Sequence, residues 1–377
     1  MPTELLVNAF YLQEEATRAL RRGEPQRVVD EVLTKARQLG ATLVRLHANH
    51  ADETKRGDSA MRLGPDDHDE LAWRGLDHVL ARAQVHGLRL VLVLGNQWDE
   101  LGGARTYVRW SGVRDARPAD GRFFTHAATI ALFESHVAQT LERCSSLDGQ
   151  RYGAHPAIAG WELLNEPRGE GLDAWGHSVR EWLDRLARRV RAHAAPSQWI
   201  TSGEEGLDVT SEGRDTAFWR RARATWLFRA RTSFSLNARS PWIEHPSVHL
   251  YPETWGVSPA LVGAAGERML RESAAIARAH GKRLFVGELG LRRSVAQGAR
   301  IASLATRRDI LRRWLDVAAE LDAVAVGPWM LAHDARPPSW DDYQFYVRDG
   351  LPLDHDDNGL APAIAAWSHR PNRDGPA

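Results

Sequence analysis

The run Ile158-Ala159-Gly160-Trp161-Glu162-Leu163-Leu164-Asn165-Glu166-Pro167 begins as a mostly apolar segment and ends in an Asn-Glu-Pro turn. A short, nearly continuous apolar segment is typical of a strand buried in a parallel sheet. The stretch that follows, Trp175–Ala192, is amphipathic and predicts a helix. The region therefore forms one strand–helix unit, and polar residues stand where its strand ends.

The same alternation of strand and helix recurs along the whole chain. The predicted strands are Leu5–Phe10, Leu43–His47, Leu90–Leu94, Ile158–Leu163, Trp199–Ser202, Val248–Leu250, Leu284–Val286 and Ala323–Val326. The predicted helices are Val28–Leu39, Trp73–His86, Ala127–Arg143, Trp175–Ala192, a poorly defined one within Thr216–Leu236, Pro259–His280, Ile301–Leu321 and a short last one at Ala361–Trp367. Eight such units predict an α/β fold, a single-domain (β/α)8 TIM barrel. We expect the domain to span residues 1–370 and to end in a frayed tail, 371–377.

A doubly wound open sheet is the alternative α/β architecture. Such sheets more often carry a glycine fingerprint directly after a strand. No G-x-G-x-x-G follows a predicted strand here, and no G-x-x-x-x-G-K-[ST] occurs. Dinucleotide and nucleotide sites therefore lack their phosphate cradle, and the barrel is favoured.

Composition excludes several classes of partner. The chain has 49 basic and 49 acidic residues, so it has no general electrostatic attraction for nucleic acid or an acidic membrane, and neither is expected as a partner. Its single cysteine, Cys144, excludes an internal disulfide framework and is expected to be buried. No apolar run reaches the about 18–20 residues of a membrane span, and the start lacks a signal-peptide pattern. We expect a cytoplasmic protein, unless a leader has been removed.

Tryptophan is unusually frequent, with 15 residues against 9 phenylalanines and 6 tyrosines. Some of the tryptophans fall within strand or helix patterns, and we expect them to pack in the core: Trp161, Trp175, Trp182, Trp226 and Trp314. Others fall at strand ends and loops, where an indole ring can stack on a flat ligand: Trp98, Trp255, Trp329 and, less directly, Trp110.

Polar and aromatic residues gather where the predicted strands end. Barrel enzymes carry their chemistry at these carboxyl ends and in the loops that follow them. The groups in question are Arg45 and His47, Asn96-Gln97-Trp98-Asp99, Asn165-Glu166-Pro167, Gly203-Glu204-Glu205-Gly206, His249-Leu250-Tyr251-Pro252, Gly287-Glu288 and Pro328-Trp329. A barrel built for packing alone would not need them.

Glu166 and Glu288 follow the fourth and seventh strands, which lie on opposite sides of the barrel mouth. Their carboxylates can converge across it, an arrangement that indicates glycoside hydrolysis. One carboxyl must be protonated to assist the leaving oxygen. The other must be ionised to attack the anomeric carbon or to activate water.

These residues resemble glycoside hydrolase family 5, part of the retaining barrel clan, and within it the endo-β-1,4-mannanase branch. The resemblance runs from Leu43 to Trp329 and rests first on the Arg of strand two, the Asn-Glu-Pro, the His-x-Tyr of strand six and the Glu of strand seven. Finer matches are Asn96-Gln97-Trp98-Asp99 with Gly102-Gly103, Phe123-Phe124-Thr125, Tyr152–Ile158 leading into Trp161–Arg168, Gly203–Gly206 and His249–Trp255.

The resemblance implies that Glu166 is the general acid/base and that Glu288 is the nucleophile. It implies supporting roles as well: Arg45 holds Glu288 ionised, Asn165 bonds the substrate 2-hydroxyl, His249 lines the subsite of the reacting sugar, Tyr251 donates to Glu288, and Trp329 is the platform beneath that sugar. Cleft-lining positions are matched by Trp98, Glu205 and Trp255. No metal or other cofactor is expected.

The expected activity is retaining hydrolysis of β-mannosidic linkages, β-1,4 above others, in mannan or manno-oligosaccharides. An exo-acting β-mannosidase on short or imported oligosaccharides, a family 5 β-glucanase and a catalytically silent carbohydrate-binding barrel are alternatives. The insert Ala48–Leu71 could close one end of the cleft and favour exo action, or it could be a solvated loop.

Some residues depart from the mannanase pattern or permit another chemistry. Arg231-Thr232-Ser233-Phe234 stands where mannanases commonly have Gly-Thr-Asp-Phe, and Asn96-Gln97 replaces their Asn-Asn. His47-Ala48-Asn49-His50 permits a metal-hydrolase interpretation, but the His-x-His that usually accompanies it on the first strand is absent.

Overall fold

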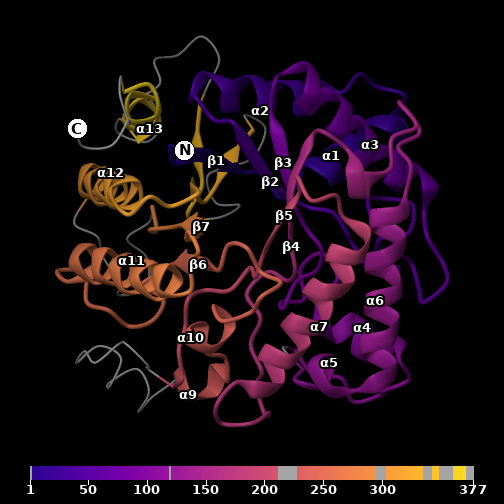
Figure 1. The fold of residues 1–377 in the computed structure, drawn as a ribbon. Helices are drawn as coiled ribbons and strands as arrows, with labels where there is room; N and C mark the ends of the chain where they lie inside the picture. The colour runs from indigo at the N-terminus through magenta and orange to yellow at the C-terminus, as the bar shows by residue number, and fades with distance from the viewer. Residues whose placement is uncertain are drawn as a thin grey trace.

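The computed structural model describes residues 2–118, 120–210, 227–293, 303–333, 342–347 and 360–370. An eight-stranded parallel sheet curls into a nearly closed barrel, with helices around it (Figure 1). The strands are β1 (Glu4–Asn8), β2 (Leu43–His47), β3 (Arg89–Val93), β4 (Ile158–Glu162), β5 (Trp199–Thr201), β6 (Ser247–Leu250), β7 (Phe285–Leu289) and β8 (Ala325–Pro328). Their order is β5-β4-β3-β2-β1-β8-β7-β6, and a bridge from Thr201 to His245 joins the β5 edge to the segment before β6. The predicted TIM barrel is confirmed.

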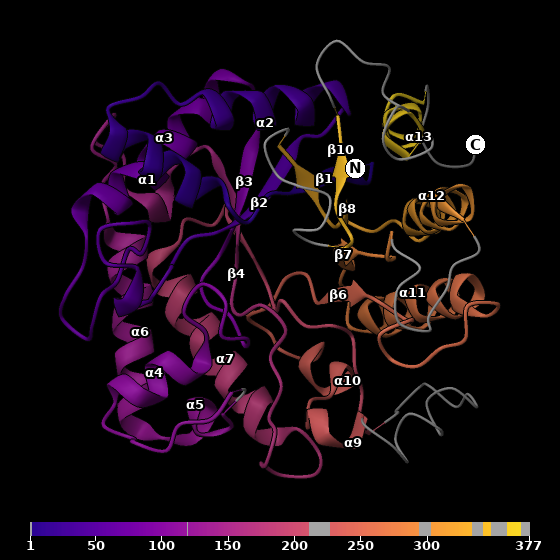
Figure 2. The ribbon, with the colours of Figure 1, turned by 180° about the vertical axis from the view of Figure 1, so that it is seen from behind.

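Helices cover the outside of the barrel. Those that match predicted helices to within a few residues at each end are α2 (Arg27–Gln38), α3 (Glu70–Val85), α6 (Ala127–Glu142), α7 (His177–His193), α11 (Val262–Ala279), α12 (Leu304–Glu320) and α13 (Leu360–Ser368). Figure 2 shows α11, α12 and α13 in succession along one side of the molecule. Of the region Thr216–Leu236, the described part holds α9 (Leu227–Ala230) and the start of α10 (Phe234–Asn237).

Several elements are absent from the sequence prediction. They are α1 (Leu12–Arg22), α4 (Ala104–Trp110), α5 (Arg122–Thr125), the 3-10 turns η1 (Glu53–Lys55) and η2 (Tyr152–Ala154), and the parallel pair β9 (Leu331–Ala332) and β10 (Phe345–Tyr346). The buried face of α1 includes Gln13 and Thr17 beside small alanines, so its apolar pattern is weak. It is stabilised by contact with α3, where a side chain at Gly75 would meet the Thr17 hydroxyl at 2.3 Å.

The inside of the barrel has an apolar layer with a polar layer above it. The apolar layer consists of Leu6, Leu43, Val91, Ala159, Phe285, Val324 and Ala325, with Trp199 packed against it. Because side chains alternate along a strand, the residue two positions after an inward-facing one also faces inward. Asn8 follows Leu6 and Arg45 follows Leu43 in this way, and both are fully buried. The polar layer therefore lies at the carboxyl ends of the strands.

Two predictions of burial are wrong. Trp175 is 54% exposed, because α7 begins at His177 and leaves this indole in the loop after β4. Cys144 is exposed, because α6 ends before it. Burial is confirmed for three of the predicted core residues: Trp161, Trp182 and Trp314.

Trp226 and the tail 371–377 lie outside the described residues. Within the described ranges, no helix is long and apolar enough to cross a membrane.

Candidate active site

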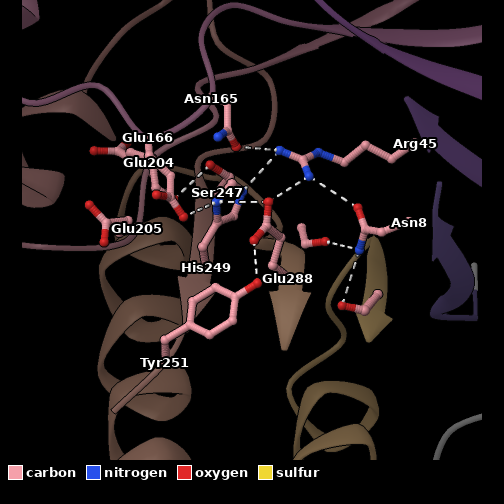
Figure 3. A network of polar contacts seen from close by, with 12 residues as sticks. Asn8, Arg45, Asn165, Glu166, Glu204, Glu205, Ser247, His249, Tyr251 and Glu288 are labelled. Atoms are coloured by element: carbon pink, nitrogen blue, oxygen red, sulfur yellow. Dashed lines mark hydrogen bonds and ion pairs between the residues drawn. The ribbon is translucent and has the colours of Figure 1, made fainter. Parts of the chain in front are cut away.

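Arg45, on β2, stands at the centre of a polar network at the carboxyl end of the barrel (Figure 3). Its side chain is fully buried. Nη1 donates to Oε1 of Glu288 at 2.7 Å and to Oδ1 of Asn8 at 3.0 Å, and Nη2 donates to Oδ1 of Asn165 at 2.9 Å. A guanidinium presents its N–H groups in one plane, so this single side chain orients acceptors from β1, the loop after β4, and β7.

Two residues of this network are missing from the sequence prediction. Glu162, on β4, is fully buried and accepts from Nε and Nη2 of Arg45 at 2.7 and 2.6 Å. Asn8, at the end of β1, donates to the backbone oxygen of Gly287 at 2.9 Å. The available signal was a polar residue near the carboxyl end of an otherwise apolar strand. Such a residue must find a buried partner, because an unpaired polar group inside a barrel is costly.

Glu288 lies on β7 and is held by two strong donors. Besides Arg45, the phenol of Tyr251 donates to its Oε2 at 2.5 Å. Burial raises the pKa of Glu288 above its ordinary value, while His249, Arg45 and the Tyr251 hydroxyl all oppose that rise. The structure thus places Tyr251 and Arg45 where the sequence analysis expected them. Both act in the direction that favours the carboxylate form.

Glu166 follows β4 with φ of 56°, in the left-handed region. A non-glycine residue rarely adopts this region, at a cost of about 1–3 kcal/mol. The backbone N–H of Glu166 donates to the oxygen of Gly203 at 2.8 Å, which fixes the turn. Its carboxyl accepts from the indole N–H of Trp98 at 2.7 Å. Burial raises the pKa of Glu166, while the charge of Arg168 and the Trp98 N–H oppose that rise. Glu166 accepts from a neutral indole, whereas Glu288 accepts from the Arg45 guanidinium, so the first proton to enter the pair belongs on Glu166.

His249, on β6, lies between the two carboxyls. Its Nδ1 is 3.1 Å from Oε1 of Glu166 and 3.4 Å from Oε1 of Glu288, and its Nε2 is 3.4 Å from Nη2 of Arg45. An arginine can only donate, so this contact makes Nε2 an acceptor and places the proton of the neutral ring on Nδ1. Burial lowers the pKa of His249, which favours that neutral form.

One carboxyl oxygen of Glu166, one of Glu288 and a ring nitrogen of His249 all lie within 4.8 Å of one another. Such a trio could also hold a metal ion. A divalent ion there would lie beside the guanidinium of Arg45, whose Nη1 is 2.7 Å from Glu288. The donor set therefore fits an acid–nucleophile pair better than a metal centre.

Glu205, after β5, is joined to the site through Arg168. Its two oxygens accept from Nε and Nη2 of Arg168 at 2.6 and 2.7 Å. The same guanidinium lies over the Trp98 ring, 4.8 Å from its centroid. Glu205, Arg168 and Trp98 thus form a supporting chain that ends at Glu166. Glu205 is among the residues predicted from the sequence, whereas Arg168 had no predicted role.

The predicted aromatic platforms differ in how much ring they expose. Trp329 is half-buried at the end of β8 and packs edge-on against Phe10, with the two ring centroids 5.0 Å apart. Trp98 is half-buried, with Arg168 over its ring. Trp255 is 7% exposed and belongs to the hydrophobic core, so it offers little ring surface to a ligand.

The insert Ala48–Leu71 is packed against the loop that carries Trp98. The backbone N–H of Ala51 donates to the oxygen of Leu101, and a side chain at Gly102 would meet the Ala51 oxygen at 1.8 Å. Arg62 is buried and donates to the backbone oxygen of His136 at 2.7 Å. The insert is therefore a packed part of the rim rather than a loose solvated loop.

Comparison with known proteins places this chain in a family. Residues 6–344 match the family model described as GH family 5 beta-mannosidase-like. A putative mannan endo-1,4-beta-mannosidase 5 of Oryza sativa subsp. japonica is 32% identical over 311 residues, which cover 80% of this chain and 60% of that protein. The chain spans about half to 60% of the length of the first curated relatives it matches.

Solved structures share the fold. The endo-beta-1,4-mannanase from Thermotoga petrophila aligns with a TM-score of 0.82 at 23% identity, covering 97% of this chain and 76% of that chain. A glycoside hydrolase family 5 mannosidase from Rhizomucor miehei aligns with a TM-score of 0.73 at 16% identity, covering 97% and 92%. The match to the family model spans most of the chain and agrees with this barrel. The chain therefore belongs to glycoside hydrolase family 5, in its β-mannosidase-like group.

Proposed function

We propose that the protein hydrolyses β-mannosidic linkages, β-1,4 above others, and retains the configuration at the anomeric carbon. The observation that carries this proposal is the approach of Glu166 and Glu288 to within 4.8 Å, oxygen to oxygen. Retaining glycosidases hold their carboxyl groups about 5–5.5 Å apart, whereas inverting ones leave about 6.5–9.5 Å for a water molecule. The curated plant relatives named mannan endo-1,4-beta-mannosidases support mannose as the sugar.

The reaction takes two displacements. In the first, the ionised carboxylate of Glu288 attacks the anomeric carbon and forms a glycosyl ester, while the proton of Glu166 passes to the departing glycosidic oxygen. In the second, Glu166 takes a proton from water. The water oxygen then attacks the anomeric carbon, and the bond to Glu288 breaks.

Other residues of the site orient the reacting sugar. The amide of Asn165 is fixed, since Oδ1 accepts from Arg45 and Nδ2 donates to Asn96 at 3.0 Å. A fixed amide beside Glu166 suits recognition of the substrate 2-hydroxyl. Trp329 offers a half-buried indole on which the apolar face of that sugar can stack.

The stereochemistry of the first product tests the mechanism. Hydrolysis of an aryl β-mannoside followed by proton NMR should show the β-anomer of mannose first, with the α-anomer appearing later by mutarotation. If the α-anomer forms first, the reaction inverts, and the assignment of Glu288 as nucleophile fails. A parallel assay on an aryl β-glucoside distinguishes this activity from that of a β-glucanase, which would prefer the glucoside.

Product size separates endo from exo action. Mannohexaose should be converted to mixed di- and trisaccharides by an endo enzyme, whereas an exo enzyme releases mannose alone from the outset. The insert at 48–71 packs against the loop that carries Trp98, and closure of one end of the cleft by this insert would favour exo action. Cleavage of cellohexaose in preference to mannohexaose would replace mannose by glucose as the substrate sugar.

The Trp98→Phe variant should shift the pH dependence of kcat/KM. Activity needs Glu166 protonated, so its pKa sets the basic limb. The Trp98 N–H lowers the pKa of Glu166, and its removal should raise that pKa and move the basic limb to higher pH. The acidic limb, which Glu288 sets, should stay in place. Trp110→Phe, which alters a rim indole bonded to Glu53 rather than Glu166, is the matched control.

A further inference from the structure

Glu162 is a buried carboxylate beside the catalytic pair that the two displacements do not use. We propose that Glu162 is a positioning residue, which fixes the direction of the Arg45 guanidinium and balances its charge throughout the reaction. This inference rests on the proposed function and goes beyond it, because Glu162 touches neither the substrate nor the bond that breaks.

The geometry of the ion pair between Glu162 and Arg45 supports the claim that Glu162 fixes the direction of the guanidinium. Both oxygens of Glu162 are engaged by Nε and Nη2 of Arg45, at 2.7 and 2.6 Å, and neither residue is exposed. The guanidinium is planar, so fixing these two nitrogens also fixes the remaining one. That nitrogen, Nη1, donates to Glu288 at 2.7 Å. Glu162 therefore determines where the donor to the nucleophile points.

Glu162 has little freedom to move away. It ends β4, and Gly203, after β5, packs directly against it. Gly203 has φ of 81°, and a Cβ added there would lie 2.8 Å from Cγ and from Oε1 of Glu162. The close approach of this glycine holds the carboxylate in the position that meets Arg45.

The change of charge on Glu288 during the reaction supports the claim that Glu162 balances the charge of Arg45. When Glu288 forms the glycosyl ester, it loses its negative charge and can no longer neutralise Arg45. A buried guanidinium without an anion is strongly unfavourable. Glu162 remains as its partner in both halves of the reaction. Its charge also opposes ionisation of Glu166, since electrostatic repulsion from Glu162 raises the pKa of Glu166.

The test compares Glu162→Gln with Glu162→Asp, which keeps the charge. In the Gln variant kcat should fall about 100-fold, because Arg45 loses its fixed direction. The basic limb of kcat/KM on an aryl β-mannoside should also move to lower pH, by about 0.5 unit or more, because repulsion on Glu166 is gone. The Asp variant should lose part of kcat and keep the basic limb where the wild type has it.

Asp77→Asn is the matched control. Asp77 is equally buried on α3 and is paired with an arginine, Arg143, at 2.8 Å, but it lies outside the network of Arg45. Its loss should reduce stability and leave the basic limb in place. An unmoved basic limb in Glu162→Gln would overturn the proposal, and so would a limb in Glu162→Asp displaced as far as in the Gln variant.

A second measurement does not depend on activity. Carbon-13 NMR of glutamate-labelled protein follows the titration of the Glu166 carboxyl, which should occur at lower pH in Glu162→Gln than in the wild type. If the wild type hydrolyses no β-mannoside, the proposed function fails, whereas the titration still tests Glu162. If Glu162→Gln does not fold, the Asp variant decides the question, because a displaced Glu166 titration there contradicts the role given to the charge.

Discussion

Glu288→Ala should lower kcat/KM for β-mannosides by about 10⁵-fold, the size of loss expected when the nucleophile of a double displacement is removed. The carboxylate that would form the bond to the anomeric carbon is gone, and water is not positioned to attack that carbon from the same face of the sugar. The fold should persist, because Arg45 keeps Glu162 as an ion-pair partner. The measurement is the initial rate on an aryl β-mannoside, with circular dichroism and thermal unfolding to show that the variant is folded.

Azide gives this variant a distinctive product. It can enter the space left by the Glu288 carboxylate and attack from the α face, yielding α-mannosyl azide from a β-mannoside with a good leaving group. Glu267→Ala, on α11 and bonded to Arg271 and Arg313 at the surface, is the control and should retain full activity. Unchanged hydrolysis by Glu288→Ala would exclude the assigned nucleophile. Hydrolysis by the wild type that is lost in Glu288→Ala would also exclude a catalytically silent carbohydrate-binding barrel, because such a barrel binds sugar without hydrolysing it.

Glu166→Ala should show a loss that depends on the leaving group. For manno-oligosaccharides, whose leaving oxygen needs a proton, kcat/KM should fall about 10³-fold, within the range of general acid–base catalysis. For 2,4-dinitrophenyl β-mannoside, whose leaving group needs no proton, the first displacement should slow only about 10-fold or less. The glycosyl enzyme should then accumulate and be visible as a burst of dinitrophenol.

The azide product distinguishes Glu166 from Glu288. In Glu166→Ala azide attacks the glycosyl enzyme from the β face and should give β-mannosyl azide, the opposite anomer to that from Glu288→Ala. Equal loss on both substrates, or the α-azide from this variant, would contradict the role of Glu166 as acid and base. Mass spectrometry of the accumulated intermediate should place the sugar on the peptide that contains Glu288.

The alternation of apolar strands with amphipathic helices was sufficient to predict the barrel. Each of the eight barrel strands occurs within a few residues of its predicted position, because a strand buried on both faces needs a continuous apolar run. The regular spacing also placed Glu166 and Glu288 at strand ends that meet across the barrel. Among the elements missed, α1 buries mainly small and polar residues, so its sequence carries a weak apolar pattern, and it packs against α3.

Local sequence could not show which tryptophans meet solvent. Trp175 lies just before a helix and is exposed, whereas Trp255 lies in a rim loop and is buried. Whether an indole is covered depends on residues distant in the chain. That information is absent from a pattern read over a few neighbouring positions.

The sequence by itself determined the fold class, the family and the two carboxylates, because strand periodicity and strand-end motifs are local features. Only the tertiary structure decided how the carboxylates are held. Arg45 meets Glu162, Asn165 and Glu288 across 117, 120 and 243 positions of the chain, and Trp98 meets Glu166 across 68. Closing the barrel creates these contacts. They decide which carboxyl keeps its proton, since a charged donor favours ionisation more strongly than a neutral indole.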